Sequence, residues 1–119
     1  MANPNIVAVT SIYGKTAVQD ITTSATAIVT NSASSGEVYK VGSLIVSNID
    51  GTVAADVTVD LLRGGSSYKI VSTVSVPANA TLVVIAKDTG IYLEEGDSLR
   101  CLASAAGDLQ AVCSYETIN

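Results

Sequence analysis

The sequence contains no histidine, no tryptophan and no phenylalanine. Histidine is the side chain that most often transfers protons near neutral pH, and it supplies the commonest imidazole ligand of metal ions. Two cysteines without histidine do not make a zinc site. Tryptophan, the residue that a sugar-stacking platform would favour, is missing as well. These absences predict a protein that is not an enzyme, with no catalytic residue, no cofactor and no metal site.

Charged side chains are also scarce, at 14% of the chain against about 25% in an average soluble domain. The net charge is −5, and the six basic residues are scattered along the sequence. Binding to a phosphate backbone requires several cations on one face, so no nucleic-acid partner is expected. Interfaces between proteins are depleted in Lys, Glu and Asp. The low charge therefore indicates a chain that packs against copies of itself, as a homo-oligomer, or against a larger assembly.

Long apolar runs are absent too, since none approaches the roughly 18 residues of a membrane-spanning helix. No membrane partner is therefore expected. Residues 1–5 carry neither the basic region nor the apolar segment of a secretory signal, which predicts synthesis in a cytoplasm. This short polar end is expected to be flexible. The 119 residues, 48% of them hydrophobic, fit a single domain over 1–119.

The β-branched residues Val, Ile and Thr make up about a third of the chain, and such residues favour pleated, half-buried strands over helices. Apolar and polar residues alternate with period two between clusters of Gly, Asn, Asp and Ser. The pattern predicts an all-β fold, an antiparallel β-sandwich (jelly-roll-like) of eight to ten short strands. The predicted strands span 6–13, 16–22, 26–30, 37–49 with a break at Gly42, 53–62, 67–76, 80–87, 91–93, 99–103 and 109–115.

Three connections between these strands are predicted to be tight turns. Asp50-Gly51 is a strong signal for a two-residue hairpin, because both residues tolerate positive φ. Gly64-Gly65 marks a second tight turn; the Gly64-Gly65-Ser66-Ser67 run resembles a phosphate cradle only in composition, because no Lys-Ser/Thr ending follows it. Residues 105–108 are predicted to close a final hairpin.

The two cysteines have two possible roles. If the final hairpin closes symmetrically about Gly107, Cys101 lies directly opposite Cys113, close enough for a cross-strand disulfide. Alternatively, both are small buried thiols packed in an apolar core. The lack of an export signal favours the buried thiols.

The carboxylates form two groups in the sequence. Asp56 and Asp60 alternate on one strand face, and Glu94, Glu95 and Asp97 cluster at one corner. A paired-carboxylate hydrolase needs its two groups a few ångströms apart in a cleft, and the corner lacks the ligand count of a calcium loop. The corner is predicted to be a solvated turn, with metal binding as the alternative.

Several segments, in collinear order along the whole chain, resemble small virion structural proteins of contractile-tailed phages that infect marine cyanobacteria. These segments are NPNIV at 3–7, TSIYGKT at 10–16, GSLIVSN at 42–48, VPA at 76–78, YLEEGDSL at 92–99 and VCSYE at 112–116. They are turn and strand landmarks rather than catalytic or ligand signatures. The resemblance implies a non-enzymatic component of the virion, made in the host cytoplasm.

Three roles fit this implication. The first is decoration of the outer capsid shell, with the major capsid protein as partner. The second is a head–tail neck, collar or tail-fibre attachment component, with neck or tail proteins as partners. The third, a receptor- or sugar-binding module, requires an exposed aromatic platform that the missing Trp and Phe argue against.

Overall fold

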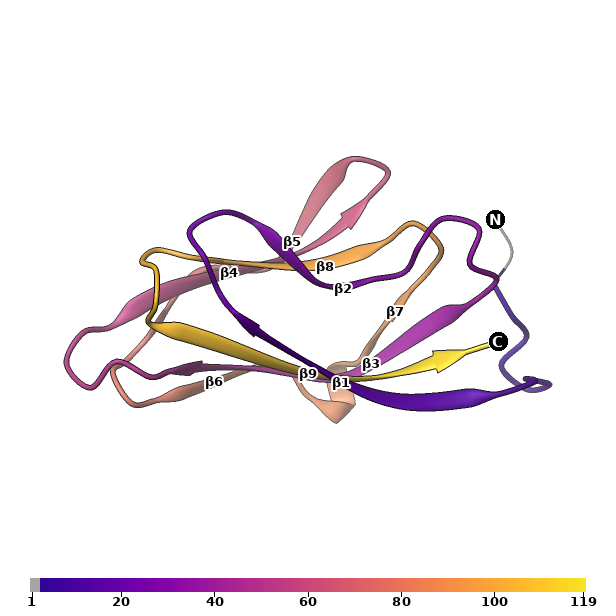
Figure 1. The fold of residues 1–119 in the computed structure, drawn as a ribbon, viewed down its shortest axis with the longest axis horizontal. Helices are drawn as coiled ribbons and strands as arrows, with labels where there is room; N and C mark the ends of the chain where they lie inside the picture. The colour runs from indigo at the N-terminus through magenta and orange to yellow at the C-terminus, as the bar shows by residue number, and fades with distance from the viewer. Residues whose placement is uncertain (1–2) are drawn as a thin grey trace.

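Alternating burial along the chain shows why these residues form strands. In the strand Ser98–Ala103, every second side chain is buried and those between are half-buried. The computed structural model describes residues 3–119, and within them the chain forms nine strands and one 3-10 turn (Figure 1). The strands are β1 (Ile12–Asp20), β2 (Thr26–Thr30), β3 (Val38–Asn48), β4 (Ala55–Arg63), β5 (Ser66–Val76), β6 (Thr81–Ile85), β7 (Ile91–Leu93), β8 (Ser98–Ala103) and β9 (Leu109–Ile118); the turn η1 spans Lys87–Thr89.

The strands form two antiparallel sheets packed face to face, visible as the lower and upper layers of Figure 1. Sheet A has the order β1-β9-β3-β6, with β7 also paired to β3, and sheet B has the order β2-β8-β4-β5. This is the strand order of a jelly roll with one additional short strand, β7. The predicted β-sandwich is confirmed.

The core lies between the two sheets. Val41, Leu44 and Val46 of sheet A and Val57 and Val59 of sheet B are completely buried. On β4 the residues Asp56 and Thr58 are only half-buried, on the outer face opposite Val57 and Val59, as period-two alternation requires, although Asp60 on the same outer side is buried as well.

The first predicted strand is wrong. Residues 6–8 form a turn, in which Asn5 accepts hydrogen bonds from Ala8 N–H on its carbonyl and from Val7 N–H on its side chain. Strand β1 begins at Ile12 and continues to Asp20, through residues 14 and 15 that separate the predicted strands 6–13 and 16–22. An Asn side chain that bonds the backbone two residues on stabilises a turn, and it overrides the local alternation.

The chain start is attached to the rest of the molecule from residue 3 on. Asn3 donates a side-chain hydrogen bond of 2.7 Å to Glu94, and Thr10 and Ser11 bond the backbone of Asn119. The flexibility expected for residues 1–5 falls partly on residues 1 and 2, which lie outside the described residues.

Two predicted hairpins are also wrong, because their strands belong to different sheets. Asp50-Gly51 lies between β3 of sheet A and β4 of sheet B, and residues 104–108 lie between β8 of sheet B and β9 of sheet A. The turn at Gly64-Gly65 does join paired neighbours, β4 and β5, and both glycines have positive φ (59° and 79°). That hairpin stands out from the upper layer in Figure 1.

Candidate functional site

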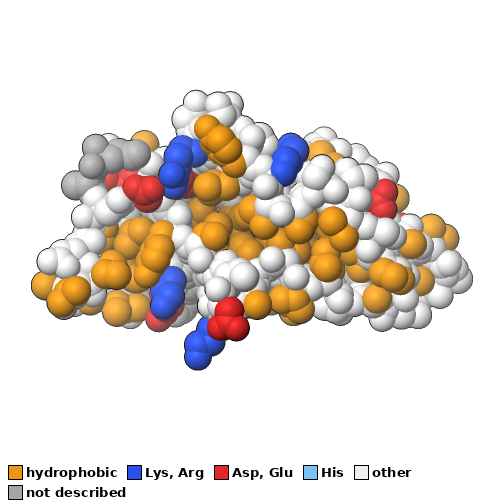
Figure 2. Space-filling model, turned by 180° about the vertical axis from the view of Figure 1, so that it is seen from behind, with side chains coloured by type: hydrophobic (Ala, Val, Ile, Leu, Met, Phe, Trp, Pro, Cys, Tyr) orange, Lys and Arg blue, Asp and Glu red, His pale blue; other side chains and the backbone are white. Residues whose placement is uncertain are grey.

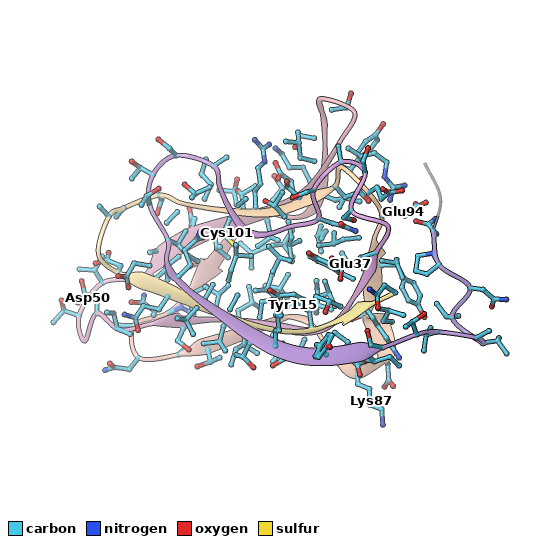
Figure 3. All side chains as sticks on the ribbon, turned by 45° about the vertical axis from the view of Figure 1, so that its right-hand side comes forward. Glu37, Asp50, Lys87, Glu94, Cys101 and Tyr115 are labelled. Atoms are coloured by element: carbon cyan, nitrogen blue, oxygen red, sulfur yellow. The ribbon has the colours of Figure 1, made fainter. Side chains whose placement is uncertain are left out.

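The two cysteines lie in opposite sheets. Cys101 of β8 has Thr26 and Val59 as strand neighbours, whereas Cys113 of β9 has Ala17 and Leu44. The register that would place them opposite each other in one hairpin therefore does not exist. Both are free thiols buried in the core, and Cys101 is labelled in Figure 3.

Burial disfavours the thiolate form of both cysteines. It raises the pKa of Cys101 to about 12, with a further contribution from the nearby Cys113, and it raises the pKa of Cys113 to about 11. The thiolate is the nucleophile and the metal ligand. Neither cysteine supplies it at neutral pH in the folded state.

The acidic corner between β7 and β8 is not the solvated turn that was predicted. Asp97 is 1% exposed and Glu95 is 4% exposed. Arg63, at the end of β4, donates to both oxygens of Asp97, from Nε at 2.9 Å and from Nη2 at 2.6 Å. The same Nη2 lies 2.8 Å from a carboxylate oxygen of Glu94. We call Arg63, Glu94 and Asp97 the corner clamp.

Hydrogen bonds decide the protonation state of Asp97. Its burial acts to raise the pKa, but the hydrogen bonds from Arg63 and from Glu94 N–H, together with the Arg63 charge, outweigh burial and lower the pKa. Asp97 is therefore ionised at neutral pH, and its oxygens are occupied by donors of the same chain.

The loop after β2 is attached to this corner as well. The buried Asn31 side chain donates to the carbonyls of Glu37 and Leu93 at 2.9 Å each and accepts from Ser35 at 2.6 Å. Gly36 N–H bonds Glu95 at 3.1 Å. An open depression of about 420 Å³ lies over the corner. The polar groups that line this depression bond residues of the same chain.

In the second carboxylate group, Asp60 is also bound by side chains of the same chain rather than placed in a reaction site. Asp60 lies on the outer face of sheet B with only 4% exposure. It accepts two hydrogen bonds from Arg100 (2.9 and 2.8 Å) and one from Ser67 (2.5 Å), and Lys69 Nζ lies 3.5 Å away. The Arg100 hydrogen bond is the largest influence on the Asp60 pKa, which is lowered although burial opposes it.

The structure places the two carboxylate groups singled out in the sequence in different surroundings. Asp56 lies on the same strand as Asp60 but does not share its partners, so the pair does not form a two-carboxylate site. Within residues 3–119 there is no group of three His, Cys, Asp or Glu side chains that could hold a metal ion. The same residues contain no helix long and apolar enough to cross a membrane.

The tyrosines do not gather into one aromatic platform. Tyr39 and Tyr115 pack against each other with ring centroids 5.6 Å apart. The exposed Tyr13, Tyr68 and Tyr92 lie on β1, β5 and β7. These positions supply no stacked surface for a sugar.

The surface is rich in exposed apolar side chains. One long side of the molecule carries a band of hydrophobic side chains with charged groups at its margins (Figure 2). Exposed large apolar residues occur on both sheets and on the connections. Extensive apolar surface on a folded domain indicates contacts with other protein chains.

Comparison with known proteins shows the fold. No protein-family model and no curated protein matches the sequence. Among solved structures, a chain from Bacillus endospore appendages, described as disulfide-linked pili, has a TM-score of 0.54 at 19% identity, covering 92% of this chain and 88% of that one. A chain from the acid-stable capsid of Helicobacter pylori bacteriophage KHP30 has a TM-score of 0.52 at 10% identity, covering 94% and 90%. The likeness runs nearly end to end in both pairs, and it establishes a shared jelly-roll architecture.

Proposed function

We propose that this chain is a non-enzymatic structural protein of a phage particle that decorates the outer capsid shell, with the major capsid protein as its partner. The observation that carries the proposal is the fold likeness to a chain of a phage capsid, which spans 94% of this chain. The resemblance of its sequence segments to virion proteins of cyanobacterial phages supports the same role.

The chemistry of the molecule supports a structural role over catalysis. The buried carboxylates Asp60 and Asp97 are paired with arginines, and the two thiols are buried in the core. The polar groups of this chain thus stabilise its own loops and sheet.

Net charge favours the outside of the shell. The chain carries −5, and packaged DNA repels an acidic protein. The outer sides of the two sheets form two broad faces, one of which can lie on a capsid while the other faces solvent.

A second role, as a head–tail neck, collar or tail-fibre attachment component, is favoured by the likeness to a pilus subunit. The fold of this chain is similar both to a chain from a pilus and to a chain from a capsid. The two roles differ in how many copies each particle contains.

The copy number of the chain per purified particle therefore tests the proposal. Quantitative mass spectrometry against the major capsid protein is expected to give comparable amounts of the two proteins. A very low ratio would support the neck, collar or fibre role and contradict decoration. Absence from the particle would overturn the virion role itself.

A binding experiment separates decoration from a general affinity for capsid protein. Purified chain is expected to co-sediment with assembled shells and to bind unassembled capsid subunits much more weakly, because a decoration site is completed by assembly. Equal binding to both would contradict a role on the shell.

A further inference from the structure

The outer face of sheet A carries a continuous apolar row across all four of its main strands. Val18 of β1 pairs with Val112 of β9, Val112 pairs with Ile45 of β3, and Ile45 pairs with Val83 of β6. Val18 is 75% exposed and Val83 is 58% exposed. Directly paired residues on one face have neighbouring Cβ atoms, so these four side chains form one stripe.

The rows on either side of this stripe are almost free of charge. One side carries Gln110, Ser47 and Thr81 with Asp20 at the margin; the other carries Thr16, Ser114 and Ser43. An apolar centre within a polar, weakly charged surround is the composition of a protein–protein interface.

Two opposite charges lie one row farther along the strands. Lys40 of β3 and Glu116 of β9 are register partners, and both side chains are exposed. In the described part of the chain, the ion pairs involve other residues, so this lysine and this glutamate are available to a second molecule.

The shape of the face has a protrusion on one side and a hollow on the other. The turn η1 lies beyond β3, between β6 and β7, and Lys87 points away from the sandwich on the sheet A side (Figure 3). An open depression of about 300 Å³ extends from β1 across β9 to β3, and its lining includes Gly14, Thr16, Lys40 and Glu116.

We propose that a second copy of this chain binds this face, related by a two-fold axis that runs parallel to the strands between β9 and β3. Such an axis places β9 over the partner copy's β3, and β1 over its β6. Each Val112 then faces an Ile45, each Val18 faces a Val83, and each Glu116 faces a Lys40. Each η1 turn meets the depression at the other copy's β1. The sheets pack in the aligned arrangement that twisted sheets adopt.

Charge complementarity identifies a second copy as the occupant. The axis exchanges the positions of β9 and β3. Glu116 of each copy therefore faces Lys40 of the other copy, and each dimer contains this contact twice. In a two-fold interface the same patch serves both copies and must be self-complementary. The two charges, the apolar row, and the η1 protrusion with the depression all meet this condition about the same axis.

The size of the face is sufficient for a dimer of modest affinity. Four strands at about 4.8 Å spacing and about nine residues at about 3.3 Å each give roughly 19 by 30 Å, or about 570 Å². The inserted turns add area, which approaches the roughly 800 Å² per partner of a standard interface. The inference concerns the isolated chain and does not depend on the proposed virion role.

Sedimentation equilibrium of the purified chain tests the dimer. The expected mass is twice the 12.1 kDa of one chain, decreasing to one chain on dilution. Val18→Glu is expected to weaken association about tenfold or more, because it places a charge in the apolar row. Val53→Glu, at a 55% exposed position outside this face, is the matched control and should leave the dimer intact.

A charge-swap experiment tests the axis itself. Lys40→Glu alone sets two glutamates against each other at both of these contacts, and Glu116→Lys alone sets two lysines against each other. Each single variant should therefore dimerise about tenfold or more weakly. An equimolar mixture of the two variants restores opposite charges across the interface and should form a heterodimer. In each variant, residues 40 and 116 of the same chain still carry like charges. Recovery of association can therefore come only from contact between chains. Thermal melting of each variant confirms that it is folded.

Three results would overturn the proposal. A parent chain that stays monomeric to about 1 mM shows that this face does not bind a second copy even weakly, and loss of shell binding by Val18→Glu would then assign the face to capsid protein. A trimer or larger ring excludes the two-fold axis. Failure of the mixture to recover association excludes the pairing of Lys40 with Glu116.

Discussion

At the scale of single residues, two buried asparagines perform the same task at two places in the sandwich. The Asn48 side chain donates to the carbonyls of Val53 and Val76 at 2.9 Å each, and Asn31 donates to two carbonyls in the same way. Each lies at or directly after the end of a strand, before the chain crosses to other elements. A buried carbonyl without a donor costs about 1–3 kcal/mol, so these amides stabilise crossings that turn residues alone do not specify.

The buried valines provide the residue-scale prediction. Val59→Asp places an unpaired carboxylate between the sheets, where Val59 is completely buried, and it should cost about 4 kcal/mol or more and abolish folding. Far-UV circular dichroism and solubility measure the loss, with Val53→Asp in an exposed connection as the control. A soluble Val59→Asp variant with a cooperative melt would contradict the inward facing of this position.

At the scale of elements, the corner clamp couples the β4–β5 hairpin to the connection between β7 and β8. Arg63 and Asp97 are 34 residues apart in sequence, and the arginine side chain is about half exposed while the aspartate is buried. A bidentate arginine–carboxylate pair fixes relative orientation as well as distance. The clamp therefore holds two neighbouring connections of the sandwich in one arrangement.

The clamp predicts a pH dependence. Because the folded pKa of Asp97 lies below its ordinary value, its stabilisation is present above the unfolded pKa of about 3.9 and decreases as pH falls through the lower folded pKa. Asp97→Asn should reduce the free energy of unfolding at pH 7 by about 1–3 kcal/mol. It should also flatten the further decline below about pH 4. Urea unfolding at a series of pH values measures both.

The matched control for this prediction is Asp56→Asn. Asp56 is half-buried and lies outside the ion pairs of the described residues. Its replacement should leave the acid limb of the stability curve close to that of the parent. An Asp97→Asn variant that follows the parent curve at every pH would show that the clamp does not contribute to stability.

At the scale of the whole molecule, the interior is closed by both sheets together. Cys101 and Cys113 come from opposite sheets and share one core cluster. A reagent can reach either thiol only when the sheets separate or a large part of the sandwich opens. The thiols therefore report on the cooperativity of the complete fold.

Thiol labelling with a water-soluble aromatic disulfide measures this closure. The folded chain should react about 10³-fold or more slowly than the same chain in denaturant, as expected for a domain that opens only by global unfolding. Two thiols per chain should react after denaturation. Rapid labelling of the folded chain would show local opening, and no reactive thiol in denaturant would show that the two cysteines are joined across the sheets.

The sequence by itself determined the structural features that depend only on residues close to one another along the chain. Its β-branched residues and period-two alternation specified strands, the facing of Val57 and Val59, and the turn at Gly64-Gly65, because each follows from local sterics and from the alternation of side chains along a strand. The fold class follows from these local preferences taken together.

Only the tertiary structure decided which strands are neighbours. Turn residues look the same whether the chain returns in one sheet or crosses to the other. Asp50-Gly51 and residues 105–108 were therefore predicted to close hairpins, but both lie in connections that cross between the sheets. The burial of Asp97 and Asp60 depends on Arg63 and Arg100, which are 34 and 40 residues away. The sequence does not state that proximity, because it is set by the packing of two sheets whose strands come from the whole chain.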